Sequence, residues 1–329
     1  MDSSSRRALG IAAAAAAFSP LARPAPAQGA YPDRPVRLVV AFPPGGPTDV
    51  VARILAERMA RDLGQPVVVE NRGGANGNIA AEAVAKAPPD GYTVLYNTSS
   101  IAISRALYRS LPYDVLRDLA PVALTAASPL ALVVHPSLPP RDPPGFIAWA
   151  RANSGRVSYS SGGVGNISHL LSFLVLRHIG AEATHVPYRG TAAALTDAAA
   201  GNVQFTSDTV VTALPVIQEG RVRAIAVSSA ERTPLLPDVP SMSEAGMMPP
   251  GFEVGAWQGI LAPARTPPEA VSRLNAAVRA ALADPEAAAR LAAQGARPTG
   301  GSPGDYARHL REEVERWGRV VAESGATAE

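Results

Sequence analysis

One stretch of the chain predicts its fold: Phe42-Pro43-Pro44-Gly45-Gly46-Pro47-Thr48-Asp49-Val50-Val51-Ala52-Arg53. The apolar run over 36–41 that precedes it is typical of a buried parallel strand. After it, apolar residues recur at helical spacing as far as Met59. The chain therefore passes directly from strand to helix, through a turn whose two glycines can both adopt a positive φ.

This turn allows two interpretations. Thr48 or Asp49 stands where a helix N-cap belongs. A glycine turn before a helix also offers free N–H groups and the positive end of the helix dipole to a small anion. Alternatively, it is only a tight connection, in which Asp49 caps the helix and pairs with Arg53 one turn later. The first interpretation gains weight because the pattern recurs later in the chain.

The composition is that of an ordinary globular protein. The 329 residues suffice for two domains with a sizeable core, and 47% are hydrophobic and 18% charged. The pI of about 9.1 comes partly from residues 1–27, since the rest of the chain holds equal numbers of basic and acidic residues. No basic patch is interleaved with aromatic residues, so nucleic acid is not an expected partner. The chain lacks cysteine, which excludes disulfides, thiolate metal sites and a lipid-anchored cysteine.

Residues 1–27 have the features of a secretory signal. Arg6-Arg7 form a charged region, the segment 9–18 is apolar, and Ala25-Pro26-Ala27 is a typical cleavage site. The twin arginine also resembles the export signal for folded proteins, so the export route stays open. No stretch reaches the roughly 18 apolar residues of a membrane span. We therefore expect a periplasmic protein with a signal peptide cleaved near Ala27.

The strand–loop–helix pattern is repeated in both halves of the chain. Strands are expected at 66–70 and 92–96, the latter ending near Thr98, and a second glycine loop, Ser160 to Asn166, follows a strand at 157–159. Such repeats predict parallel sheets with loops gathered at the strand ends, where open α/β sheets bind ligands. We expect one lobe from 31–126 plus 255–329 and another from 127–254, with a hinge and a ligand cleft between them.

Catalysis and metal binding have little support in the sequence. The five histidines show no metal-ligand spacing, and no serine-hydrolase elbow or Walker loop occurs. His169 could contact a ligand or be a structural histidine. Asp208, at a strand end, could receive a ligand ammonium or hydroxyl, or could cap the segment from Thr209 onward. Because neither glycine loop contains arginine, we expect a bound carboxylate to be held mainly by backbone N–H groups and water.

With these residues in hand, the mature chain resembles the extracytoplasmic substrate-binding proteins of tripartite tricarboxylate transporters, the Bug family. The resemblance covers 31–322 and rests on several ordered blocks, which are Phe42 to Asp49, Val69 to Arg72, Pro89 to Thr93, Leu111 to Asp114, Ser160 to Leu170, Val186 to Gly190 and Pro237 to Pro240. It implies an α/β fold of the type II periplasmic-binding-protein class, and a monomer that delivers a small carboxylate to a two-component membrane transporter without cofactor or metal.

The resemblance also implies a set of ligand-binding residues. On one lobe these are Gly45, Gly46, Thr48 and Asp49, and on the other Ser161, Gly162, Gly163 and Asn166; Asp208 would read the variable part of the ligand. Phe42, Thr98 and His169 complete the predicted set. The sequence departs from the family pattern at Gly73, Asn76, Asn166 and Phe173. Asn76 can still adopt the left-handed conformation that glycine usually provides there.

Two other functions stay open at this point. A periplasmic sensor subunit that signals to a histidine kinase would have the same fold and the same kind of ligand. An exported hydrolase using His169 and Asp208 is the third hypothesis. Dicarboxylates, tricarboxylates, amino acids, aromatic acids and neutral nicotinamide-like molecules all remain candidate ligands.

Overall fold

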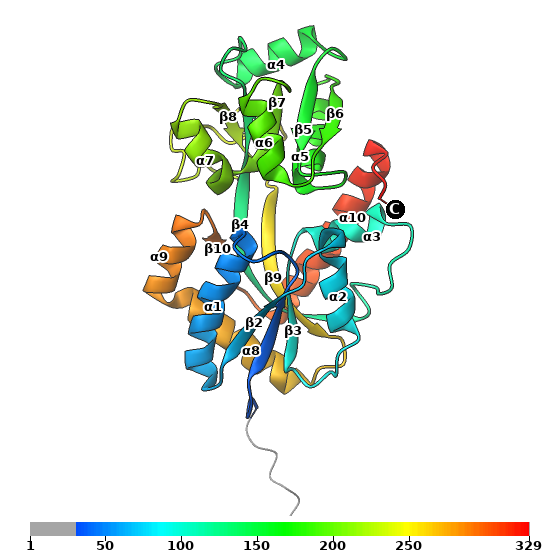
Figure 1. Ribbon diagram of the computed structural model, residues 1–329, viewed down its shortest axis with the longest axis vertical. Helices are drawn as coiled ribbons and strands as arrows, with labels where there is room; N and C mark the ends of the chain where they lie inside the picture. The colour runs from blue at the N-terminus through cyan, green and yellow to red at the C-terminus, as the bar shows by residue number, and fades with distance from the viewer. Residues whose placement is uncertain (1–30, 329) are drawn as a thin grey trace, which may run out of the picture.

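The computed structural model describes residues 31–328, which form two α/β lobes joined by long strands (Figure 1). The signal peptide predicted over 1–27 lies outside the described residues. None of the helices within 31–328 is long and apolar enough to cross a membrane.

The first lobe contains the strands nearest the N-terminus together with the returning C-terminal part of the chain. Its strands are β1 (Val36–Val40), β2 (Val67–Asn71), β3 (Thr93–Thr98), β9 (Gly255–Pro263), β10 (Arg297–Pro298) and the first part of β4 (Leu119–Val134). Its helices are α1 (Pro47–Leu63), the 3-10 turn η1 (Ala75–Gly77), α2 (Asn78–Ala85), α3 (Ser100–Leu107), α8 (Pro268–Ala283), α9 (Pro285–Ala293) and α10 (Pro303–Ser324).

The second lobe is built from the middle of the chain. Its strands are the end of β4, β5 (Ser158–Ser161), β6 (Thr184–Pro187), β7 (Phe205–Thr209) and β8 (Arg223–Val227). Its helices are α4 (Pro143–Ala152), α5 (Ile167–His178), α6 (Thr191–Ala199) and α7 (Val210–Gln218). The strands predicted at 66–70, 92–96 and 157–159 are confirmed to within one or two residues.

Strand β4 connects the two lobes. It pairs with β9 from Leu119 to Pro129 and with β7 and β8 from Leu130 onward, in every case antiparallel. The strand order is β2-β1-β3-β9-β4-β7-β5-β6, with β1 parallel to β2 and β3, and β5 parallel to β6 and β7. The lobe boundaries expected near 127 and 255 lie where this pairing changes, and their placement stays a prediction.

The pairing fixes the direction of every strand. Because β9 runs antiparallel to both β3 and β4, β1 and β3 run towards the second lobe. Because β7 runs antiparallel to β4, β5, β6 and β7 run towards the first lobe. The carboxyl ends of the parallel strands in each lobe therefore point at the opposite lobe, as Figure 1 shows for β1 and β3.

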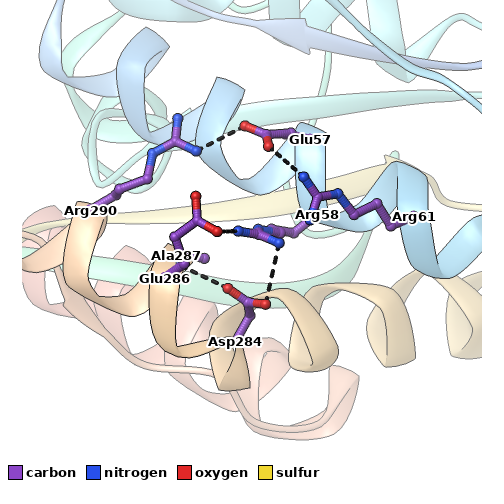
Figure 2. A network of polar contacts seen from close by, with 7 residues as sticks. All are labelled: Glu57, Arg58, Arg61, Asp284, Glu286, Ala287 and Arg290. Atoms are coloured by element: carbon purple, nitrogen blue, oxygen red, sulfur yellow. Dashed lines mark hydrogen bonds and ion pairs between the residues drawn. The ribbon is translucent and has the colours of Figure 1, made fainter.

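Helix α1 is fixed against the corner between α8 and α9 by a network of charged side chains (Figure 2). The buried Arg58 guanidinium pairs with Asp284 at 3.4 Å and with Glu286. Glu57 pairs with Arg61 at 3.0 Å on its own helix and with Arg290 of α9 at 2.8 Å. Asp284 also caps α9, where its side chain accepts from Ala287 N–H. The anchored helix holds its own N-terminus, and hence the first glycine turn, in place.

A second buried polar contact ties β9 to α10. The indole N–H groups of Trp257 and Trp317 both donate to Glu313 Oε2, each at 2.8 Å. Arg316 pairs with the other carboxylate oxygen at 2.9 Å. Trp317, with Tyr306, Leu310 and Val321, forms the buried face of α10. These contacts fix β9 to α10 of the first lobe.

Candidate functional site

The turn before α1 differs in two details from the sequence prediction. Its helix begins at Pro47 with Gly46 as the N-cap, so neither Thr48 nor Asp49 is the cap. Pro47 takes the first helical position because its fixed φ suits that place, and this moves Asp49 to the third. Only Gly45 has a positive φ (81°), whereas Gly46 is extended with φ −77°. The backbone conformation at position 46 therefore does not require a glycine.

Asp49 organises this turn from inside. Its buried carboxylate accepts hydrogen bonds from Gly45 N–H (2.9 Å), Arg53 Nε (2.9 Å) and Asn71 Nδ2 (2.8 Å). Asn71 also donates to the carbonyl of Phe42 at 3.0 Å, which joins the strand end to the turn. Burial raises the pKa of Asp49, but these donors outweigh it and lower the pKa below its usual value. The predicted Asp49–Arg53 pair is confirmed.

The loops after β2 and β3 complete the edge of the first lobe. Asn76 has φ 56° and ψ 29°, which confirms the expected left-handed conformation. Gly77 lies against the buried Asn97 amide, whose Oδ1 accepts from Thr98 N–H (2.7 Å) and Ser100 Oγ (3.1 Å). The Thr98 hydroxyl in turn donates to Ser100 Oγ at 3.1 Å. Thr98 therefore lies at this edge, half-buried, as part of a hydrogen-bonded turn.

The glycine loop of the second lobe is likewise closed by its own side chains. The Ser161 hydroxyl accepts from Gly163 N–H at 3.2 Å, and Ser168 Oγ accepts from Gly162 N–H at 3.0 Å. Asn166 is the N-cap of α5 and accepts from Ser168 N–H at 3.0 Å. These bonds give the loop one defined shape.

His169 belongs to this internal network. Its Nδ1 accepts from Gly165 N–H at 3.1 Å, and its ring stacks on that of His185 with centroids 3.7 Å apart. His185 Nε2 lies 2.6 Å from Ser161 Oγ. Burial, with the neighbouring His185, lowers the pKa of His169 to about 3, and burial lowers that of His185 to about 4. Both rings are therefore neutral at pH 7 and support the loop.

The N–H groups that remain available to an anion are not those of the glycines. The N–H groups of Gly45, Gly162, Gly163 and Gly165 all bond within their loops. In α1 and α6, in contrast, no side chain caps the first turn, and within 31–328 the N–H groups of Thr48, Asp49, Thr191, Ala192 and Ala193 have no partner. The start of α6 is a site that the sequence analysis missed.

Asp208 lies close to the start of α6. The β5–β7 register pairs Ser160 with Thr206, so two residues further Asp208 is level with Gly162. Side chains alternate along a strand, and Ser207 Oγ bonds to Ser172 of α5 at 2.9 Å. Asp208 therefore faces away from α5, which carries His169, so these two residues do not form the pair that hydrolysis would need.

Strand β4 sets the spacing between the facing edges of the two lobes. Thr98 pairs with Gln258 of β9, which in turn pairs with Ala126 of β4. Asp208 pairs with Ala131 of β4. Five residues of strand separate the two levels, about 16 Å. A separate cavity of about 880 Å³ lies beside the ends of α5 and α10, and none of the predicted residues lines it. No cluster of three or more potential metal ligands occurs within the described part of the chain.

The chain is similar to several known proteins over most of its length. Residues 51–326 match the model of the tripartite tricarboxylate transporter family receptor. Protein BugT of Bordetella pertussis is 39% identical over 298 residues, which are 90% of this chain and 91% of BugT. A solved structure described as R. palustris Rpa4515 with adipate is 40% identical, with a TM-score of 0.80, covering 90% of this chain and 99% of that one. MatC from Rhodopseudomonas palustris with bound malate is 38% identical, with a TM-score of 0.75, covering 88% and 100%.

Proposed function

Because the chain belongs to the tripartite tricarboxylate transporter receptor family, we propose that it is a periplasmic receptor for a small carboxylate. It captures the carboxylate between its lobes and delivers it, as a monomer, to a two-component membrane transporter, without chemical turnover. Export by the signal at 1–27, cleaved near Ala27, is part of the same proposal.

One observation carries the choice of ligand. The first turns of α1 and α6 offer unpartnered N–H groups and positive dipole ends, and each lies at the strand ends that point to the other lobe. Among the described residues in and next to the loops at these strand ends, the arginines are Arg53, Arg72 and Arg189. Arg53 is already hydrogen-bonded to Asp49. The N-termini of two helices, one from each lobe, can together bind one anionic group through backbone N–H groups, with no need for a cationic side chain. Adipate and malate, the ligands of two structural relatives, are carboxylates of this size.

The test is binding by calorimetry to the mature protein, refolded to remove any ligand retained during purification. The panel holds malate, succinate, glutarate, adipate and citrate, with nicotinamide as the neutral compound. We expect saturable binding of at least one carboxylate with no product formed. Binding of nicotinamide alone, or turnover of the ligand, would contradict the proposal.

A charge placed at the start of α6 tests the position of the site. Ala193 is exposed in the first turn of α6, so Ala193→Asp supplies a carboxylate where the ligand's would lie. We expect at least tenfold weaker binding without loss of thermal stability, because acidic residues favour helix N-termini. Ala276→Asp, on the exposed face of α8, is the matched control and should bind as the unchanged protein does.

A further inference from the structure

Asp208 is a buried carboxyl group with one unsatisfied oxygen. Its side chain is 2% exposed, and Oδ1 accepts from Thr209 N–H at 2.7 Å. Oδ2 has no hydrogen-bond partner within the described chain. A buried acceptor of this kind is costly unless something completes it, and a charged one more so. Such a group calls for a functional explanation.

The surroundings of Asp208 contain no cation. The facing segments of β4 and α7 carry no titratable residue, and β5 contributes only Tyr159. Asp197 of α6 is engaged by Tyr188 and by Asn202 at 2.9 Å, and Arg223 of β8 donates to the carbonyl of Pro140 at 2.8 Å. Arg189, before α6, is exposed, and His169 and His185 are stacked together on the α5 side. Within the described residues, no cationic side chain pairs with Asp208.

The uncapped start of α6 lies beside this carboxyl. Thr191 is its first residue, and the Thr191 side chain and the Thr209 N–H only partly offset the effect of burial, which raises the pKa of Asp208 to about 7. Gly162, level with Asp208, is in turn so close to Thr191 that a Cβ on Gly162 would overlap the Thr191 methyl group. The carboxyl, the glycine loop and the helix end therefore belong to one small region.

From this arrangement we infer that Asp208 is a neutral carboxylic acid in the ligand-bound protein, and that capture of a carboxylate takes up one proton at this residue. The inference rests on the proposed function and adds to it. In the bound state Oδ2 carries the proton and can donate to an acceptor oxygen of the ligand. Asp208 would then select for acceptor-bearing carboxylates and against a ligand with an ammonium group at that end.

The size of the coupling follows from electrostatics. A ligand charge about 10 Å away, at an effective dielectric constant of about 20, favours the neutral form of a carboxyl by more than tenfold. Affinity for a carboxylate should therefore fall about tenfold between pH 6 and pH 9, as the free protein loses this proton. An asparagine amide has nearly the shape of the neutral acid and cannot ionise, so Asp208→Asn should remove this dependence.

Calorimetry at pH 8.0 measures the proton directly. Binding of adipate, or of malate if adipate does not bind, is measured in phosphate and in Tris, whose heats of ionisation differ. We expect uptake of more than half a proton per ligand in the unchanged protein and in Asp142→Asn, a control at the exposed cap of α4. Asp208→Asn should bind with no proton uptake.

The other outcomes separate this inference from the proposed function. Binding without proton uptake overturns the inference and leaves the receptor function intact. Proton release, or preference for glutamate over glutarate, shows an ionised Asp208 that meets a cationic group, and also overturns it. If no carboxylate binds, both proposals fail. Independently of ligand, carbon-13 NMR of aspartate carboxyls should show one group that titrates near pH 7 and is lost in Asp208→Asn; its absence overturns the inference.

Discussion

Replacement of Asp49 by alanine tests how the first glycine turn is held. The change removes the acceptor of three donors, two of which, Gly45 N–H and Asn71 Nδ2, also shape the turn. Hydrogen bonds to a charged group contribute about 1.5–3 kcal/mol each. Arg53 is half exposed, so its bond counts for little. The other two donors can regain water, which halves their contribution, so we expect the free energy of unfolding to fall by about 1.5–3 kcal/mol.

Urea unfolding measures this change, and carboxylate affinity should fall in parallel because the turn loses its shape. Asp62→Ala is the matched control in the same helix, where the carboxylate makes only an exposed pair with Arg273, and it should cost about 1 kcal/mol or less. A loss in Asp49→Ala no larger than in this control would refute the reasoning. Weaker binding with unchanged stability would instead mean that Asp49 contacts the ligand itself.

Three further predictions concern stability. The lowered pKa of His169, about 3, means that the folded state resists protonation, so stability should fall by about 2 kcal/mol as pH drops from 7 to 4.5; pH-dependent urea unfolding should show a smaller fall in His169→Gln. Glu313→Ala leaves two buried indole donors unpaired and should cost about 2–4 kcal/mol by urea unfolding, with Glu313→Gln intermediate. Gly165→Ala meets both a positive φ (71°) and the Leu107 side chain, and should lower stability by about 2 kcal/mol or more. In a double-mutant cycle with Leu107→Ala, followed by thermal unfolding, the two changes together should cost less than the sum of their separate costs, and the difference measures the steric part.

The general plan of the protein could be predicted because local signals agree with the tertiary structure. The apolar strand near 36–41, its glycine turn and the amphipathic helix after it agree with one another, and the local pattern of Ser302 and Asp305 coincides with a capping box at the start of α10. The apolar face of α10 packs against α3 and β4. Where propensity, pattern and packing coincide, sequence reasoning succeeds.

Other features depend on contacts that no local pattern reveals. Helix α3 is only eight residues long and largely buried, and α7 contains Pro215 among β-branched residues, so the sequence did not predict either helix. The exact cap of α1 was missed because Pro47 decides the first helical position. The use of the glycine N–H groups within their own loops depends on Ser161, Ser168 and His169, which only the fold brings into place. A glycine before an alanine-rich helix, Gly190, was the one available signal for the open end of α6.

The pairing of Pro129 with Gly255 has a consequence for how this protein can diversify. The chain enters and leaves the second lobe at neighbouring points of one antiparallel ladder, so that lobe is a single uninterrupted insertion in the first. Two genetic crossovers at these points would exchange it between relatives while both junctions keep their backbone pairing. Each descendant would inherit the α1 turn from one parent, and α6 with Asp208 from the other. New combinations of the proposed ligand-binding groups could thus arise by recombination, without a change in either half.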